Sequence, residues 1–240
     1  MKKYVFGLPF AIAVVTLFSS AQATVIVNGG FEVPAPLNPY LDHYVGNPTL
    51  FGWEIVGTLG DSVSQVRSDF NGNPPFTFPA QEGNVWLDLA GFTSNSPVGV
   101  RQTIITNPGS IHQLNFFVGN VIGGPFGISS TVGVEFDSGG VNFNCSNAGD
   151  VANPTVVTWT GCSATFTATN VSTALTFRNL DPSTDFINAL DNISVNLVGP
   201  GPVGGVPEPA TWATMILGFG AIGAAMRRTK RRRPSTPLIT

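Results

Sequence analysis

Short stretches in which apolar and polar residues alternate run through the middle of the chain, and they constrain its fold more than any other feature. In one of them, Val85 and Leu87 alternate with Trp86 and Asp88. A period of two places successive side chains on opposite faces of a β-strand. Turn-forming residues separate these stretches, because the 240 residues include 28 Gly and 19 Pro. The pattern predicts an all-β protein in which two antiparallel sheets pack face to face.

Charged residues are few and unevenly placed. They make up 10% of the chain, against ~25% in a typical soluble domain, and this excludes a coiled coil or helical bundle. The 18 Phe and 4 Trp argue against a disordered chain. Between Thr24 and Val206, three basic residues accompany thirteen acidic ones, a formal charge of -10. The scarcity of basic residues excludes nucleic acid as a partner, and an acidic middle between basic ends is typical of an exported protein.

The N-terminal segment has the composition of a secretory signal. Lys2 and Lys3 precede an apolar run over 4–18, and small residues follow in the Ala-Gln-Ala that ends at Ala23. The apolar run is shorter than the ~20 residues that a membrane span needs. The pattern predicts a signal peptide over 1–23, which signal peptidase removes.

The C-terminal segment has a second targeting pattern. A Gly/Pro-rich linker over 198–206 precedes a run of apolar and small residues over 210–226. Six basic residues within 227–233 end this run. Seventeen apolar or small residues predict a short transmembrane helix, whose basic end stays in the cytoplasm.

The same segment resembles a known sorting signal. Val-Pro-Glu-Pro at 206–209 is followed by Trp212, by Gly-Phe-Gly at 218–220 and by the Arg-rich tail. In this order the features resemble the PEP-CTERM signal of Gram-negative bacteria, which we assign to 207–233. The resemblance implies that an exosortase recognises the signal, cleaves near Pro207, Glu208 and Pro209, and removes the tail. It also implies transit through the inner membrane to the cell surface or to the exopolysaccharide matrix of a biofilm.

The body over 24–197 resembles jelly-roll domains of the galactose-binding-like type. The nearest relatives in pattern are the DUF642 type and carbohydrate-binding modules. The resemblance implies a jelly-roll antiparallel β-sandwich, while the segment 126–162 matches no motif of these families. The motifs are V-N-G-G-F-E at 27–32, G-W-E-I at 52–55, G-N-V-W-L-D-L-A-G at 83–91, R-Q-T-I at 101–104 and A-L-D-N-I-S-V at 189–195.

Two groups of residues have the chemistry to bind sugar. A pyranose packs its C–H face on an aromatic ring, while carboxylates accept hydrogen bonds from its hydroxyl groups. Trp86 and Asp88 share one strand face, and Tyr40, Asp42 and Tyr44 lie in a Pro-rich segment interpreted as a loop. The alternative, which is the commoner role of aromatic residues, is that Trp86 packs against the second sheet or a loop and the tyrosines pack locally.

Two further pairs are expected to hold the body together. Cys145 and Cys162 are the only cysteines, and export favours a disulfide between them. The resemblance to carbohydrate-binding modules implies that Glu32 and Asp191 approach each other and hold a structural Ca²⁺, with help from backbone carbonyls near 28–30. The alternative makes Glu32 a turn residue and Asp191 a surface acid.

Three functions follow from these observations. The first is a non-enzymatic surface or matrix protein that binds an extracellular polysaccharide, and the second is a structural or adhesive protein without a glycan ligand. The third, a glycoside hydrolase, would need Asp88 beside Glu135 or Asp137. An esterase is excluded, because neither His43 nor His112 stands where a catalytic base for a Gly-Asp-Ser block would.

Overall fold

The computed structural model describes residues 26–47, 49–91, 97–137, 140 and 142–199, together with a helix over 209–230. The chain divides into two units, one ending at Gly201 and the other beginning at Pro202. The signal peptide over 1–23, the linker from 200 onward, Pro207, Glu208 and the end of the basic tail lie outside the described residues.

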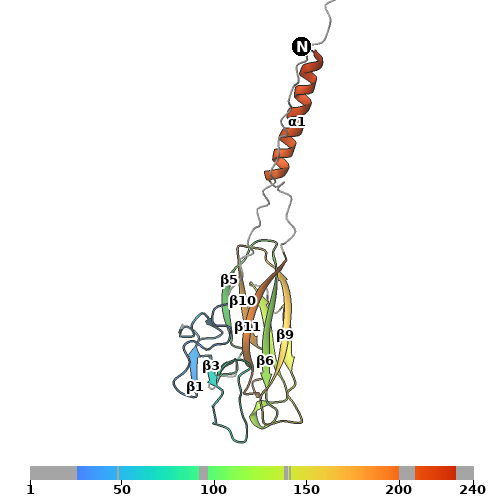
Figure 1. Cartoon of the computed structure of the whole chain (residues 1–240). Helices are drawn as coiled ribbons and strands as arrows, with labels where there is room; N and C mark the ends of the chain where they lie inside the picture. The colour runs from blue at the N-terminus through green and yellow to red at the C-terminus, as the bar shows by residue number, and fades with distance from the viewer. Residues whose placement is uncertain are drawn as a thin grey trace, which may run out of the picture. The chain divides into compact units, whose positions relative to one another are not determined.

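The first unit is a sandwich of two antiparallel sheets (Figure 1). This confirms the all-β sandwich that the alternating stretches predict. A single turn of 3-10 helix, Gly124–Phe126, interrupts the strands. The six-stranded sheet runs in the order β1 (Tyr40–Tyr44), β3 (Ser62–Arg67), β4 (Val85–Asp88), β11 (Ala189–Gly199), β6 (Ile111–Asn120) and β9 (Thr158–Thr167). The five-stranded sheet runs β2 (Glu54–Val56), β5 (Gly99–Ile105), β10 (Ser172–Asn179), β7 (Ser130–Phe136) and β8 (Phe143–Asn147).

Two separate apolar clusters stabilise this sandwich. The larger lies between the sheets, where Val85 and Leu87 of β4 are fully buried with Phe116 and Phe177. The smaller lies on the outer face of the six-stranded sheet, where loops cover the strands. Its buried members are Val66, Phe78, Trp86, Val121, Phe126, Val157, Ile187 and Ala189. Strand β4 therefore contributes to both clusters, one from each face.

The disulfide between Cys145 and Cys162 joins the two sheets. Cys145 lies in β8 and Cys162 in β9, and these strands are the last members of their respective sheets. Their Cα atoms lie 6.2 Å apart, which is within the usual range for a disulfide. The bond therefore ties the two sheets together along one side of the sandwich.

Several local predictions differ from the structure. The segment 40–44, interpreted as a loop, is strand β1 because it pairs in full register with β3. Residues 158–167 form one strand, β9, whereas the sequence predicts two separate strands over 155–160 and 163–168. The predicted strand at 25–27 is absent from the described residues, since Ile26 and Val27 lead into a turn. Asn28 in that turn and Phe31 directly after it have positive φ, so the chain does not continue as an extended strand here.

The C-terminal unit contains helix α1, Pro209–Lys230. Proline suits a first helical position, because its missing N–H has no partner there in any helix. The sequence predicts that residues 210–226 span a membrane. In the part of the chain that the structure describes, however, no helix is both long and apolar enough to do so. Glycines such as Gly218, Gly220 and Gly223 take places that long apolar side chains would fill in a stronger span.

Candidate functional site on the outer face of the six-stranded sheet

Strand register brings the two predicted sugar-binding groups onto one surface. Asp42 of β1 lies opposite Ser64 of β3, and Ser64 lies opposite Asp88 of β4. Residues directly opposite each other in paired strands share a face. The Ser64 hydroxyl donates a hydrogen bond to the Asp42 carboxylate. A polar row therefore crosses three strands on the side away from the main core.

An aromatic row runs beside it. Tyr40, Val66 and Trp86 are partners across the same three strands, two residues along from the polar row. The Trp86 ring packs nearly parallel to Phe78 at a centroid distance of 6.4 Å, and its Nε1 donates to the Phe78 carbonyl at 3.1 Å. With 2% of its surface exposed, Trp86 packs under a loop, as one interpretation of the sequence has it, and serves as a wall.

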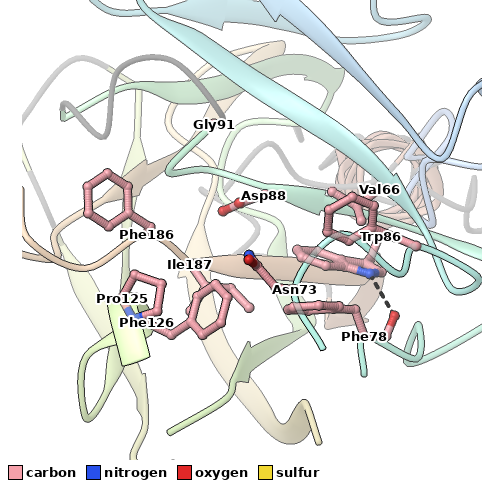
Figure 2. A pocket seen from close by; sticks show the side chains of 11 residues that line it. Val66, Asn73, Phe78, Trp86, Asp88, Gly91, Pro125, Phe126, Phe186 and Ile187 are labelled. Atoms are coloured by element: carbon pink, nitrogen blue, oxygen red, sulfur yellow. Dashed lines mark hydrogen bonds between the residues drawn. The ribbon is translucent and has the colours of Figure 1, made fainter. Parts of the chain in front are cut away.

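A cavity of about 280 Å³ opens beside Trp86 and Asp88. Segments between the strands supply four phenylalanine rings to its walls, Phe70, Phe78, Phe126 and Phe186. Figure 2 shows these rings around a space into which the Asp88 carboxyl points, and Asn73 also lines this space. Phe186 is 50% exposed, so this ring is open to solvent at the cavity. The geometry suits a flat ligand with an apolar face and polar edges.

The carboxyl of Asp88 is the buried polar group of this cavity. Its Oδ1 accepts hydrogen bonds from the backbone N–H groups of Ala90 and Asn188, both at 3.0 Å. Among the described residues, the hydrogen bonds to Asp88 both end on Oδ1 and no donor contacts Oδ2. Burial raises the pKa of Asp88 to about 6, the two backbone bonds oppose this shift, and the charge of Asp42 adds to it.

A second carboxyl lies within electrostatic reach of Asp88. Asp181 Oδ1 accepts a hydrogen bond from the Thr131 N–H at 2.6 Å. Its Oδ2 is buried without a hydrogen-bond partner in the described structure. Burial raises the pKa of Asp181 to about 7, and the carboxyls of Asp185 and Asp88 add to the rise. The charge of Asp88 therefore opposes the ionisation of Asp181.

The predicted site residues on β1 and on the other sheet lie apart from the cavity. Tyr40 and Tyr44 share the outer face with Asp42, but the cavity lining contains none of the three. Glu135 accepts a hydrogen bond from Arg178 at 2.6 Å on the five-stranded sheet, and Asp137 follows the same strand. The pair of catalytic carboxyls that a glycoside hydrolase would need, Asp88 beside Glu135 or Asp137, is therefore not formed. The carboxyls of Asp88 and Glu135 lie on opposite outer faces of the sandwich.

Sequence reasoning missed most of the rings that form the cavity. Phe70 lies in the segment 69–74, which the sequence predicts as a Gly/Pro/Asn turn, Phe78 follows that segment without a role assigned to it, and Phe126 lies in a stretch that resembles no known motif. One signal was present, because the motif N-P-P-F-T-F-P at 73–79 is too rich in aromatic residues for an exposed turn.

Glu32 and Asp191 lie close together, as the resemblance implies. Glu32 Oε1 accepts from the N–H groups of Asn84 and Val85, both at 2.8 Å. Asp191 is fully buried, so it is no surface acid, and its two oxygens accept three backbone N–H bonds at 2.7–3.2 Å. Burial raises the pKa of Asp191 to about 7, opposed by these bonds and increased by the nearby Glu32. Within the described ranges, no three His, Cys, Asp or Glu side chains form a metal-binding group.

Comparisons with known proteins give one family match and several distant likenesses. Residues 205–232 match the model of the PEP-CTERM protein-sorting motif. The chain is 25% identical over 232 residues to halomucin from Haloquadratum walsbyi; this covers 91% of the chain and only 2% of the much longer halomucin.

Two solved structures are distantly similar to this chain. The CBM22-1 xylan-binding domain of Paenibacillus barcinonensis Xyn10C is 15% identical, with a TM-score of 0.36 over 66% of this chain and 93% of that domain. The K1 cleaved adhesin domain of Lys-gingipain from Porphyromonas gingivalis is also 15% identical, with a TM-score of 0.43 over 68% of this chain and all of that domain.

Proposed function

We propose that this chain, which ends in a PEP-CTERM sorting motif, is a non-enzymatic surface protein whose β-sandwich binds a glycan in the aromatic cavity. The sorting motif indicates an exported protein that is directed to the cell surface. The observation that carries the binding function is the cavity of about 280 Å³ in which rings surround the Asp88 carboxyl. Its volume is close to the lower end of small-molecule sites, ~300 Å³, and suits one sugar ring.

The contacts within the cavity support a division of roles. The exposed ring of Phe186 offers a face on which the C–H groups of a sugar can pack. Asp88 Oδ2 and the Asn73 amide are then in place to bind the polar groups at the edge of the sugar. The extracellular polysaccharide around the cell is the ligand that a surface protein meets first. We also propose exosortase as a partner, which cleaves the chain near Pro207–Pro209.

Glycan-array binding with purified protein tests this proposal. We expect a Phe186→Ala variant to lose about fivefold to tenfold in affinity for any glycan that binds, since aromatic contacts are worth about 1 kcal/mol. Phe51→Ala is the matched control, because Phe51 is 55% exposed but lines no part of this cavity. Equal losses in the two variants, or an array without a bound glycan, would contradict a glycan site here.

A structural or adhesive role without a glycan is the second candidate. Strand β9 favours it, because this ten-residue strand pairs only with β6 among the described strands and so has one free edge. It carries no charged residue in T-W-T-G-C-S-A-T-F-T. An uncharged edge strand can add to the sheet of a second chain. Concentration-dependent self-association in sedimentation experiments, together with an empty glycan array, would favour this candidate.

A further inference from the structure

The carboxyl of Asp88 lies in a negatively charged neighbourhood. In the described part of the chain, the side chains in electrostatic contact with it are two other carboxyls, Asp42 from β1 and Asp181 from the segment after β10. His43 follows Asp42 but points to the other strand face, where its ring contacts Thr49 and Gln65. Burial lowers the pKa of His43, so this ring brings no positive charge near neutral pH.

The polar surface that Asp88 presents can only accept hydrogen bonds. An ionised carboxylate has no hydrogen to donate. Its Oδ1 is already held by two backbone N–H groups, while Oδ2 has no donor among the described residues and the carboxyl points into the cavity. Placing a carboxylate away from water is costly unless a partner supplies hydrogens and positive charge. A ligand with a positively charged donor therefore gains more here than a neutral one.

The aromatic walls favour the same kind of ligand. The faces of aromatic rings carry partial negative charge and attract cations within ~6 Å. Trp86, Phe126 and Phe186 border the cavity together with Asp88. An acidic sugar, by contrast, would bring its carboxylate towards Asp88 and Asp181, which like-charge repulsion opposes.

We propose that this cavity selects an amino sugar whose free ammonium group binds Asp88 Oδ2. This proposal rests on the proposed glycan function. The ligand class is a polysaccharide with hexosamine residues from which the N-acetyl groups have been removed. The sugar ring packs on Phe186, its ammonium group donates to Asp88, and the Asn73 amide binds a hydroxyl group. N-acetylation removes the positive charge and enlarges the group, so the acetylated polymer is discriminated against.

Calorimetric titration of the whole purified protein near neutral pH tests the selection. The probes are glucosamine oligomers, the N-acetylglucosamine oligomers of equal length, and neutral xylose or glucose oligomers. We expect the glucosamine oligomers to bind about tenfold or more tightly than their acetylated forms, because a hydrogen bond between charged groups is roughly twice as strong as a neutral one.

Asp88→Asn is the decisive variant. Asparagine keeps an oxygen for the N–H groups of Ala90 and Asn188 but presents an uncharged amide donor to the cavity. We expect it to abolish the preference for the free amine while circular dichroism confirms the fold. Glu54→Gln is the control, since it removes one negative charge from a residue that pairs with Arg101 on the other sheet.

The possible outcomes separate the two proposals. Glycan binding without a preference for the free amine, or a preference that survives in Asp88→Asn, overturns the amino-sugar inference and leaves the glycan function standing. Absence of binding to every probe overturns both. Binding that requires added Ca²⁺ shows that a metal ion, in place of an ammonium group, satisfies the carboxyl, and this also overturns the inference.

Discussion

At the residue scale, three buried aspartates determine how this fold responds to pH. The pKa values of Asp88, Asp181 and Asp191 are raised to about 6, 7 and 7, in each case mainly by burial. In the unfolded chain an aspartate titrates near ~3.9. Between these values the folded protein binds more protons than the unfolded chain does. Stability therefore falls as the pH rises from about 4 to about 7, and the protein is most stable on the acidic side.

We predict that the melting temperature is higher near pH 5 than near pH 7.5. The unfolding free energy is expected to be higher by several kcal/mol at the lower pH, because protonation of the three buried carboxyls removes the cost of burying their charge. Asp181→Asn should flatten the dependence, since its buried Oδ2 then no longer carries charge. Asp150→Asn is the control, because Asp150 is exposed and hydrogen bonds from Asn153 and Ala152 lower its pKa. A melting temperature that falls on acidification would contradict the prediction.

The proposed structural Ca²⁺ also belongs to the residue scale. Backbone N–H groups contact Glu32 Oε1 and both oxygens of Asp191, so these carboxyls already act as a clamp on the turn at 81–85. Ca²⁺ prefers six to eight oxygen ligands, and an ion here would need Glu32 Oε2 and backbone carbonyls as well. The contacts that are present therefore fit the clamp better than they fit the ion.

Calcium titration distinguishes a clamp from a metal site. If an ion binds, millimolar CaCl₂ should raise the melting temperature of the wild type and leave that of Asp191→Asn unchanged, because bound ligand stabilises the folded state. If Glu32 and Asp191 form a clamp without an ion, Asp191→Asn changes the melting temperature equally with and without Ca²⁺. A chelator then changes the melting temperature of neither the wild type nor the variant. A melting temperature of the wild type that does not change when a chelator is added is thus sufficient to exclude the ion.

At the element scale, the disulfide fixes how β8 and β9 close one side of the sandwich. The bond links two strands of different sheets, 17 residues apart in sequence. We predict that replacing both Cys145 and Cys162 by Ser lowers the unfolding free energy by about 3 kcal/mol, the value for a loop of this length in the chain-entropy model. Chemical denaturation measures the loss. Adding a reducing agent should reproduce it in the wild type and have no effect on the double variant.

Strands in which apolar and polar residues clearly alternate could be predicted from the sequence. Strands that are extended because they pair with a neighbouring strand could not. Residues 99–105 form β5 as expected, because the alternation places Val100 and Ile104 in the core. Strand β1 was missed, since Tyr-Leu-Asp-His-Tyr alternates weakly and becomes extended by pairing with β3. Strand β8 was missed because Phe-Asn-Cys-Ser-Asn has low strand propensity and depends on β7.

The candidate site was harder to predict than the strands, because it depends on contacts between segments that are far apart in the sequence. Trp86 and Asp88 can be recognised as a pair in the sequence. That Asp42 shares their face of the sheet depends on the register across three strands. The cavity also needs Phe126 and Phe186 from loops that are far apart in sequence. Neither register nor loop packing leaves a periodic signal, so residue chemistry alone could suggest members of the site but not its shape.

At the scale of the whole molecule, the predicted signal peptide and the sorting motif are expected to determine which part of the chain reaches the cell surface. The N-terminal pattern predicts a mature protein that begins at Thr24, and the PEP-CTERM motif over 205–232 indicates sorting. The Gly/Pro-rich residues before Pro207 favour an extended segment that a protease can enter. We therefore expect the body to be released from its basic tail, with an acidic composition that suits neither nucleic acid nor anionic lipid.

Intact-mass analysis of surface material tests this processing. The mature chain should begin at Thr24, end near Pro207–Pro209, and lack the basic residues 227–233. Substituting Glu208 by Ala within the Pro-Glu-Pro motif should lead to accumulation of the unprocessed chain, because recognition depends on this motif, while Glu82→Ala in the body should be processed normally. A surface form that retains 227–233 in the wild type would contradict exosortase cleavage. Since the cavity is built entirely from residues before 200, the full-length and processed forms should bind glycan with equal affinity, so that processing changes where the protein acts and leaves its binding unchanged.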